Sequence, residues 1–250
     1  MRLITAYATK NKCYIKAQKM PKGKPEGIIL HSTGANNPNL KRYVDAPAEV
    51  GTNIYKNHWN RNDLDKCVHA FIGFDKNKVV TVANILPHDV CCWGCGSGAK
   101  GSYNYNPAFF QIEICEDSLT DAPYFTEAFG AAVEYCAYIC KQYDIPVTKI
   151  LSHKEAHAKG YASNHGDCDH WLSRHGKSMT WFRNQVKALL NAPEAAPDYQ
   201  CVHTAVKGDS YWKLAAQYLG NGARYKEILQ LNGTTSTKIA IGQKIKIPNR

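Results

Sequence analysis

The sequence contains no apolar run long enough to cross a membrane. Its longest apolar runs are short, such as Gly27 to Leu30, whereas a membrane-spanning helix needs about 20 apolar residues. The first residues, Met1 to Ala6, are not followed by the apolar core of a signal peptide. These absences predict a chain that does not span a membrane, has no Sec-type export signal and is made in the cytoplasm.

Sequence patterns of nucleic-acid-binding domains are also missing, although the chain is basic. Its 31 Lys and Arg residues against 21 Asp and Glu residues give a formal net charge of +10. Such a balance favours polyanionic partners, including nucleic acids, membranes and wall polymers. Because no RNP-type or helix-turn-helix pattern is present, we expect no nucleic-acid partner. The lysines between residues 10 and 24 are interpreted as solvated loop residues.

Paired C-x-x-C motifs are absent, although the chain has ten cysteines. Cys92 and Cys95 form one such motif, but no second one completes a structural zinc site, and no helical pattern follows as in redox proteins. Cys136 and Cys140 lie in an apolar helical stripe and are expected in the core. Without an export signal, free thiols in a reducing compartment are the default expectation.

Two prolines, Pro193 and Pro197, stand among small and acidic residues and predict a linker, because proline does not continue a helix. We therefore predict a first domain over residues 1–190, a linker over 191–199 and a second domain over 200–250. In the first domain, hydrophobic patterns predict strands over 27–30, 68–74, 79–82, 108–115 and 150–152, and helices over 126–143 and after Ser178. Helices that interleave with strands indicate an α/β or α+β class.

The second domain carries a compact pattern of strand, helix, helix and strand. Strands are predicted over 202–207 and 243–247, and the helices between them are marked by a Gly-Asp-Ser cap before the first and Leu-Asn-Gly after the second. Residues 206–248 closely resemble a LysM module. LysM modules bind glycans rich in N-acetylglucosamine, so the resemblance implies peptidoglycan glycan strands as a partner.

Four side chains with metal or proton chemistry stand at predicted strand ends in the first domain. His31 and His153 each end a strand, Asp167 follows in a loop, and Glu113 lies near the end of a further strand. Two imidazoles and one carboxylate would leave a tetrahedral zinc ion with one open position. Glu113 could then accept a proton from an attacking water molecule.

These motifs, in this order, resemble zinc N-acetylmuramoyl-L-alanine amidases of the amidase-2 type, over residues 27–190. The family includes phage endolysins, bacterial autolysins and peptidoglycan recognition proteins. The resemblance implies an α/β fold with a mixed central sheet flanked by helices, a Zn2+ cofactor and a groove for the stem peptide. It also makes His31, His153 and Asp167 the zinc ligands and Glu113 a catalytic residue.

His165 occupies the position, two residues before the last ligand, where many members of this family have lysine. The resemblance implies that it stabilises the oxyanion. Some members place a catalytic tyrosine just before the hairpin histidine, but here that position is Val68. This departure favours the glutamate-dependent variant of the reaction.

Other residues compete for these roles. Cys168 directly follows Asp167 and could replace it as a ligand. His153 and His157 lie four residues apart, as in zincin helices, but the glutamate is misplaced for H-E-x-x-H. Trp93 lies in a loop that forms one wall of the groove in the family, and both stacking on substrate and packing in the core fit it.

The sequence thus predicts a peptidoglycan hydrolase that cleaves the amide bond between N-acetylmuramic acid and L-alanine. A phage or prophage endolysin, made in the bacterial cytoplasm and acting on the wall after release, fits best. A bacterial autolysin is the nearest variant. A recognition protein that does not cut, and a zinc peptidase that cuts within the stem, stay open as alternatives.

Overall fold

The computed structural model describes residues 1–192 and 199–249. Contacts divide the chain into two units, Met1–Ala192 and Pro193–Arg250, and each is described by itself. The predicted linker falls largely on residues 193–198, which lie outside the described residues. Among the described residues, no helix combines the length and the apolar character that crossing a membrane requires.

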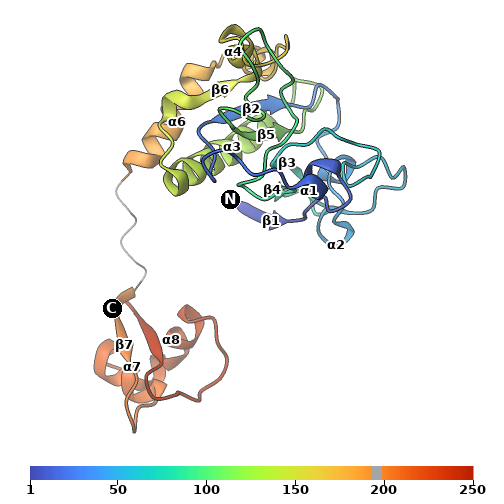
Figure 1. Ribbon diagram of the computed structural model, residues 1–250. Helices are drawn as coiled ribbons and strands as arrows, with labels where there is room; N and C mark the ends of the chain where they lie inside the picture. The colour runs from blue at the N-terminus through green and yellow to red at the C-terminus, as the bar shows by residue number, and fades with distance from the viewer. Residues whose placement is uncertain (193–198, 250) are drawn as a thin grey trace. The chain divides into compact units, whose positions relative to one another are not determined.

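The first unit is built on a six-stranded mixed sheet in the order β1-β4-β3-β5-β2-β6 (Figure 1). Its strands are β1 (Arg2–Thr5), β2 (Ile28–Ser32), β3 (Ala70–Phe74), β4 (Val80–Asn84), β5 (Phe110–Ile114) and β6 (Ile150–Ser152). β3 and β4 form an antiparallel hairpin, and all other neighbouring strands run parallel. Parallel neighbours bring the carboxyl ends of β2, β5 and β6 to one edge of the sheet.

Helices and short helical turns surround this sheet. They are α1 (Lys12–Lys16), α2 (Pro47–Val50), α3 (Ala122–Tyr143), α4 (His153–Ala158), α5 (Asp169–Arg174) and α6 (Met179–Asn191), with 3-10 turns η1 (Leu40–Arg42) and η2 (Val147–Lys149). α3 begins four residues before its predicted start because the Asp121 carboxylate accepts a hydrogen bond from the backbone N–H of Tyr124. The first strand and the helices α1, α2, α4 and α5 were not predicted, since each is too short for a clear periodicity.

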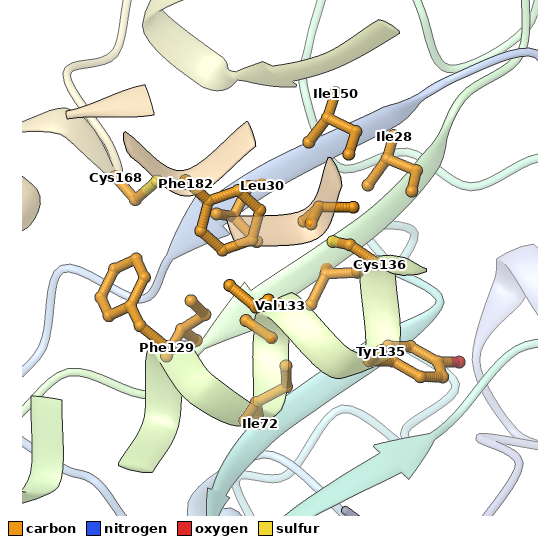
Figure 2. Close-up of a cluster of buried hydrophobic side chains, with 14 of the residues drawn as sticks. Ile28, Leu30, Ile72, Phe129, Val133, Tyr135, Cys136, Ile150, Cys168 and Phe182 are labelled. Carbon is orange, nitrogen blue, oxygen red and sulfur yellow. The ribbon is translucent and has the colours of Figure 1, made fainter. Parts of the chain in front are cut away.

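Alternate residues of the strands face two separate cores, as the pleat of a strand requires. Ile72 packs with α3 and α6 on one face, whereas its neighbour Phe71 packs with Leu40 and Tyr43 on the other. Figure 2 shows the first core, in which Phe129 and Val133 of α3 lie against the strands. Covered on both faces, the sheet is a rigid base for the side chains at its edge.

The second unit is a small α+β domain with its own core. Its elements are β7 (Tyr199–Thr204), α7 (Tyr211–Leu219), η3 (Gly222–Arg224), α8 (Tyr225–Leu231) and β8 (Lys244–Pro248). β7 and β8 pair in an antiparallel manner, and Ser210 caps α7 by accepting from the backbone N–H of Lys213. The strand–helix–helix–strand order is the predicted one, with β7 starting three residues earlier.

Candidate metal centre and peptide groove

Three strands deliver side chains to one edge of the sheet. β2 lies between β5 and β6, and its register places His31 directly beside Glu113 of β5. His153 is the first residue of α4, immediately after β6. His31 therefore lies within its strand rather than after it, and its side chain shares a face with that of Glu113.

His31, His153 and Asp167 converge into a buried cluster. The His31 Nδ1 atom lies 3.0 Å from His153 Nδ1 and 3.2 Å from an Asp167 carboxylate oxygen. The second Asp167 oxygen lies 3.5 Å from His153 Nδ1. Within the described part of the chain, these residues form the one group with the ligand types and spacing for a metal ion, with ligand atoms within 4.8 Å of one another.

The hydrogen bonds on the outer side of each imidazole determine where its lone pair points. His31 Nε2 lies 3.0 Å from the Gln111 side-chain oxygen, and His153 Nε2 lies 3.3 Å from the Ser163 hydroxyl. With protons on both Nε2 atoms, the two Nδ1 lone pairs face each other across 3.0 Å. A cation between them removes this repulsion, so the donor set fits a metal ion bound by two imidazoles and one carboxylate.

Asp167 is held in its ionised form. Burial raises its pKa, but when His153 and His31 carry a proton on Nδ1, their hydrogen bonds and positive charge outweigh burial and leave the pKa well below its ordinary value. A carboxylate that stays ionised is a competent metal ligand.

Glu113 has the opposite electrostatic environment. Burial raises its pKa well above the usual value, and the charges of Asp167 and Glu116 raise it further. Its Oε2 atom is buried without a hydrogen-bond partner in the described structure. A carboxyl group with an unsatisfied oxygen facing a cavity is suited to exchange a proton with a bound molecule.

His165 lies at the mouth of the same cavity. Its ring centroid is 4.7 Å from that of His153, and its Nδ1 atom lies 3.0 Å from the Ser163 hydroxyl. Ser163 therefore contacts both histidines, and the loop 159–168 carries His165 and Asp167 together to the cluster.

The cluster opens into a cavity of about 460 Å3. Trp59 and Trp93 contribute to its walls, along with Lys66. These flat apolar rings give the cavity surface for stacking beside the polar groups of the His31, His153 and Asp167 cluster. Of the two interpretations of Trp93, the structure supports a position in the groove.

Gln111 is a buried residue whose role the sequence did not reveal. Its side-chain oxygen faces His31, and its amide donates a hydrogen bond of 2.8 Å to the Asn104 side chain. Asn104 also accepts from the backbone N–H groups of Gly94 and Cys95. A Cβ atom at position 94 would lie 2.4 Å from the Gln111 oxygen, so glycine is required there. One network thus links the groove wall to the candidate ligand His31.

A second histidine–carboxylate pair, His170 and Glu116, reaches the cavity through its histidine. His170 of α5 lies 2.9 Å from Glu116, whose carboxylate also accepts a hydrogen bond from Ser32. The ring of His170 lines the cavity. The signal that could have found it is its spacing of three residues after Asp167.

The competing residues do not join the cluster. The Cys168 thiol faces the core, lies 3.9 Å from the Met179 sulfur, and has a pKa raised well above its usual value by burial (Figure 2). His157 contacts the backbone carbonyl of Ala162 instead. Cys92 and Cys95 are buried, and burial raises the pKa of both, to about 11 for Cys95, so neither resembles a reactive redox thiol.

Residues 21–170 match the family model described as N-acetylmuramoyl-L-alanine amidase, and this match covers more than half of the chain. The chain belongs to this amidase family. Residues 203–248 match the LysM domain, so the second unit is a LysM domain. Both predicted resemblances are confirmed.

Relatives of this amidase are similar over part of their length. N-acetylmuramoyl-L-alanine amidase CwlA from Bacillus sp is 29% identical over 161 residues, which are 64% of this chain and 53% of the relative. Protein Ami from Listeria monocytogenes is 29% identical over 130 residues, which are 52% of this chain and 12% of the relative. The chain therefore spans about half the length of one of these relatives and much less of the other.

Solved structures show the same fold at low sequence identity. The Staphylococcus aureus hydrolase AmiA superposes with a TM-score of 0.55 at 19% identity, covering 77% of this chain and 88% of that one. The catalytic domain of XlyA superposes with a TM-score of 0.52 at 17% identity, covering 74% and 99%. The predicted fold class, a mixed central sheet flanked by helices, is confirmed.

Proposed function

We propose that this amidase hydrolyses the amide bond between N-acetylmuramic acid and the first L-alanine of the peptidoglycan stem peptide. The observation that carries the proposal is the convergence of His31, His153 and Asp167 in a groove that also contains Glu113 and His165. The family membership supports the same reaction.

We propose zinc as the metal, held by His31 Nδ1, His153 Nδ1 and the Asp167 carboxylate. When bound, zinc would polarise the scissile carbonyl and activate water for attack. The protein groups supply the proton transfers and the orientation. Gln111 and Ser163 hold the two imidazoles so that their Nδ1 atoms face inward.

Glu113 is the proposed general base and acid. Its unpartnered Oε2 atom accepts a proton from the attacking water and returns it to the leaving nitrogen, so that the C–N bond breaks with release of a free amine. His165, with a proton on Nε2, donates a hydrogen bond to the carbonyl oxygen as negative charge develops. Trp59 and Trp93 keep the sugar–peptide junction in the groove.

The second unit is proposed to hold glycan strands of the wall, as its LysM domain suggests. We assign residues 1–190 to the catalytic domain, 191–199 to the linker and 200–250 to the glycan-binding domain. Tethering by the second unit raises the local concentration of the amide bonds that the first unit cleaves.

We further propose the biological role of a phage or prophage endolysin. A solved structure described as a mutant endolysin from Bacillus subtilis shares the fold, with a TM-score of 0.50 at 18% identity. Expression inside a bacterium should leave the cells intact until a hole-forming membrane protein is co-expressed. Wall lysis without such a protein would favour an exported autolysin.

The reaction is tested by digestion of purified walls with and without a chelator, followed by mass analysis of the fragments. We expect zinc-reversible clearing and intact stem peptides with free L-alanine amino groups. Glu113→Gln should reduce kcat by about 10²–10⁴-fold, whereas Glu127→Gln, on the exposed side of α3, serves as the matched control. New termini within the stem would indicate a peptidase, and wall binding without cleavage would indicate a recognition protein.

A further inference from the structure

A second, smaller cavity lies next to the groove and shares Trp93 with it. Its volume is about 220 Å3, below the roughly 300–1,000 Å3 of sites for drug-sized ligands. Asp65 borders this cavity, and its neighbour Lys66 borders the groove. The segment 65–66 and Trp93 thus contribute to both linings.

The helix α1 forms the far side of this cavity and is firmly held against the groove. Its cap, Asn11, is fully buried, and its amide donates hydrogen bonds of 3.0 and 2.9 Å to the backbone carbonyls of Trp59 and Lys66. The Cys13 thiol donates to the backbone carbonyl of Asp65. These bonds fix α1 relative to the two segments that also line the groove.

Two lysines of α1 give the cavity its charge. Lys12 and Lys16 are four residues apart, so they lie on one face of the helix, and both line the cavity. In the described structure neither ammonium group has a recorded ion pair, and Asp65 is the one acidic residue of the lining. The lining thus carries a net positive charge. Both lysines are exposed, as interpreted from the sequence, but they lie on a short helix and not in a loop.

The environment of Cys13 confirms that these groups are close together. Burial raises the pKa of the Cys13 thiol, while a hydrogen bond with the Trp93 backbone and the charge of Lys16 lower it. Trp93 and Tyr105 also line the cavity, with ring centroids 5.9 Å apart. The lining therefore combines cationic groups with flat apolar surface.

We propose that this cavity binds the terminal carboxylate of the stem peptide, with Lys12 and Lys16 as its cationic partners. The inference rests on the proposed function, which places the sugar–peptide junction in the adjacent groove. A stem peptide that is not cross-linked ends in a free carboxylate, and the volume suits one terminal residue packed against Trp93 and Tyr105. A cross-link converts the terminal carboxyl group of the donor stem into an amide, so the site selects stems whose terminal carboxylate is still free.

The test measures binding of the stem peptide released by the reaction, which the enzyme cannot cleave again. The full chain with zinc is titrated with this peptide and with its C-terminal amide, using tryptophan fluorescence or calorimetry. The free acid should bind about three- to tenfold more tightly than the amide, as expected of two solvent-exposed ion pairs. The double variant Lys12→Gln/Lys16→Gln should bind both peptides equally, whereas Lys149→Gln/Lys187→Gln should behave as the parent.

Equal affinity of the parent protein for acid and amide, or no binding of either peptide, would overturn the proposal. Competition by inorganic phosphate would also overturn it, if the competition persists at equal ionic strength and is lost in the Lys12→Gln/Lys16→Gln variant. The cavity would then suit the phosphate polymers of the wall. Cleavage of a soluble muramyl peptide by the same preparations is measured separately. If the parent protein binds acid and amide equally but cleaves normally, this site alone is rejected, whereas absence of cleavage by the parent protein rejects the proposed function.

Discussion

At the scale of single residues, the candidate metal centre depends on which nitrogen of each imidazole carries the proton. Gln111 is itself oriented, because Asn104 accepts from its amide and leaves its oxygen facing His31. A neutral side-chain amide thus selects the tautomer of His31 that presents Nδ1 to a metal ion.

We predict that Gln111→Leu weakens zinc binding by about 10–100-fold, the usual effect of removing a partner of a metal-bound histidine. The substitution leaves His31 Nε2 without an acceptor and frees the ring to rotate. Competition with a chromophoric chelator measures the Kd for zinc. Gln185→Leu, on the exposed side of α6, is the control, and an unchanged Kd for Gln111→Leu would contradict the positioning role.

At the scale of secondary-structure elements, the junction of β6 and α4 determines where His153 lies. The Ser152 hydroxyl accepts from the backbone N–H of Glu155, and the Glu155 carboxylate accepts from the backbone N–H of Ser152. Arg183 of α6 then binds Glu155 with two hydrogen bonds, of 2.7 and 3.0 Å. Strand and helix therefore join without a loop, and the first helical residue is the candidate ligand.

We predict that Ser152→Ala lowers the free energy of unfolding by about 1 kcal/mol and also weakens zinc binding. Ser178→Ala is the matched control, since the Ser178 hydroxyl caps α6 by accepting from the backbone N–H of Trp181 and Ser178 does not line the cavity of the candidate ligands. Denaturant unfolding and the zinc Kd are measured for both variants. A weaker zinc affinity in Ser178→Ala as well would mean that general stability, and not the local cap, controls the site.

His69 connects β5 to the segment after β4 and makes the fold sensitive to acid. Its Nδ1 atom accepts from the backbone N–H of Gln111 and its Nε2 donates to the Val90 carbonyl, each over 2.9 Å. Burial lowers the pKa of His69 from 6.5 to about 3. The folded protein thus holds this imidazole neutral, while the unfolded chain takes up a proton below pH 6.5.

The stabilising contribution of neutral His69 is complete above pH 6.5 and is lost as the pH falls towards 3. We predict that the free energy of unfolding decreases in this window by up to ~1.4 kcal/mol per pH unit from this residue. His69→Gln should show a flatter dependence, whatever its stability at pH 7. Urea unfolding at several pH values compares the two slopes, and identical slopes would rule out this role of His69.

At the scale of the whole molecule, the two units have separate hydrophobic cores among the described residues. The core of the second unit contains Leu214, Ile228 and Ile245, and it shares no member with the cores around the six-stranded sheet. Each unit thus has the means to fold by itself, and the two are expected to contribute separately to wall digestion.

A chain that ends at Ala192 should cleave a soluble muramyl peptide at nearly the parental rate, because the groove lies within the first unit. Its clearing of intact walls should fall by about tenfold or more, since tethering commonly adds 10²–10⁴ to effective affinity. Turnover of the soluble substrate and turbidity loss are measured side by side. Parallel loss of both activities would show that the second unit supports the catalytic domain itself.

The sequence by itself determined the fold class and the family resemblance, and it predicted two domains and the residue types of the candidate site. Long periodic segments such as α3, and caps such as Ser178 and Ser210, are local features, so they could be found from neighbouring residues alone. His31, His153 and Asp167 could be selected because their motifs resemble those of a known family.

The tertiary structure decided which of these residues meet and how each is protonated. His31 and Asp167 are 136 positions apart and become neighbours only through the parallel arrangement of the strands. Cys168 follows a candidate ligand in the sequence, yet its thiol is directed into the core by the packing of α5. The orientation of Gln111 and the lysine-lined cavity depend on hydrogen bonds between distant segments, which no local pattern encodes.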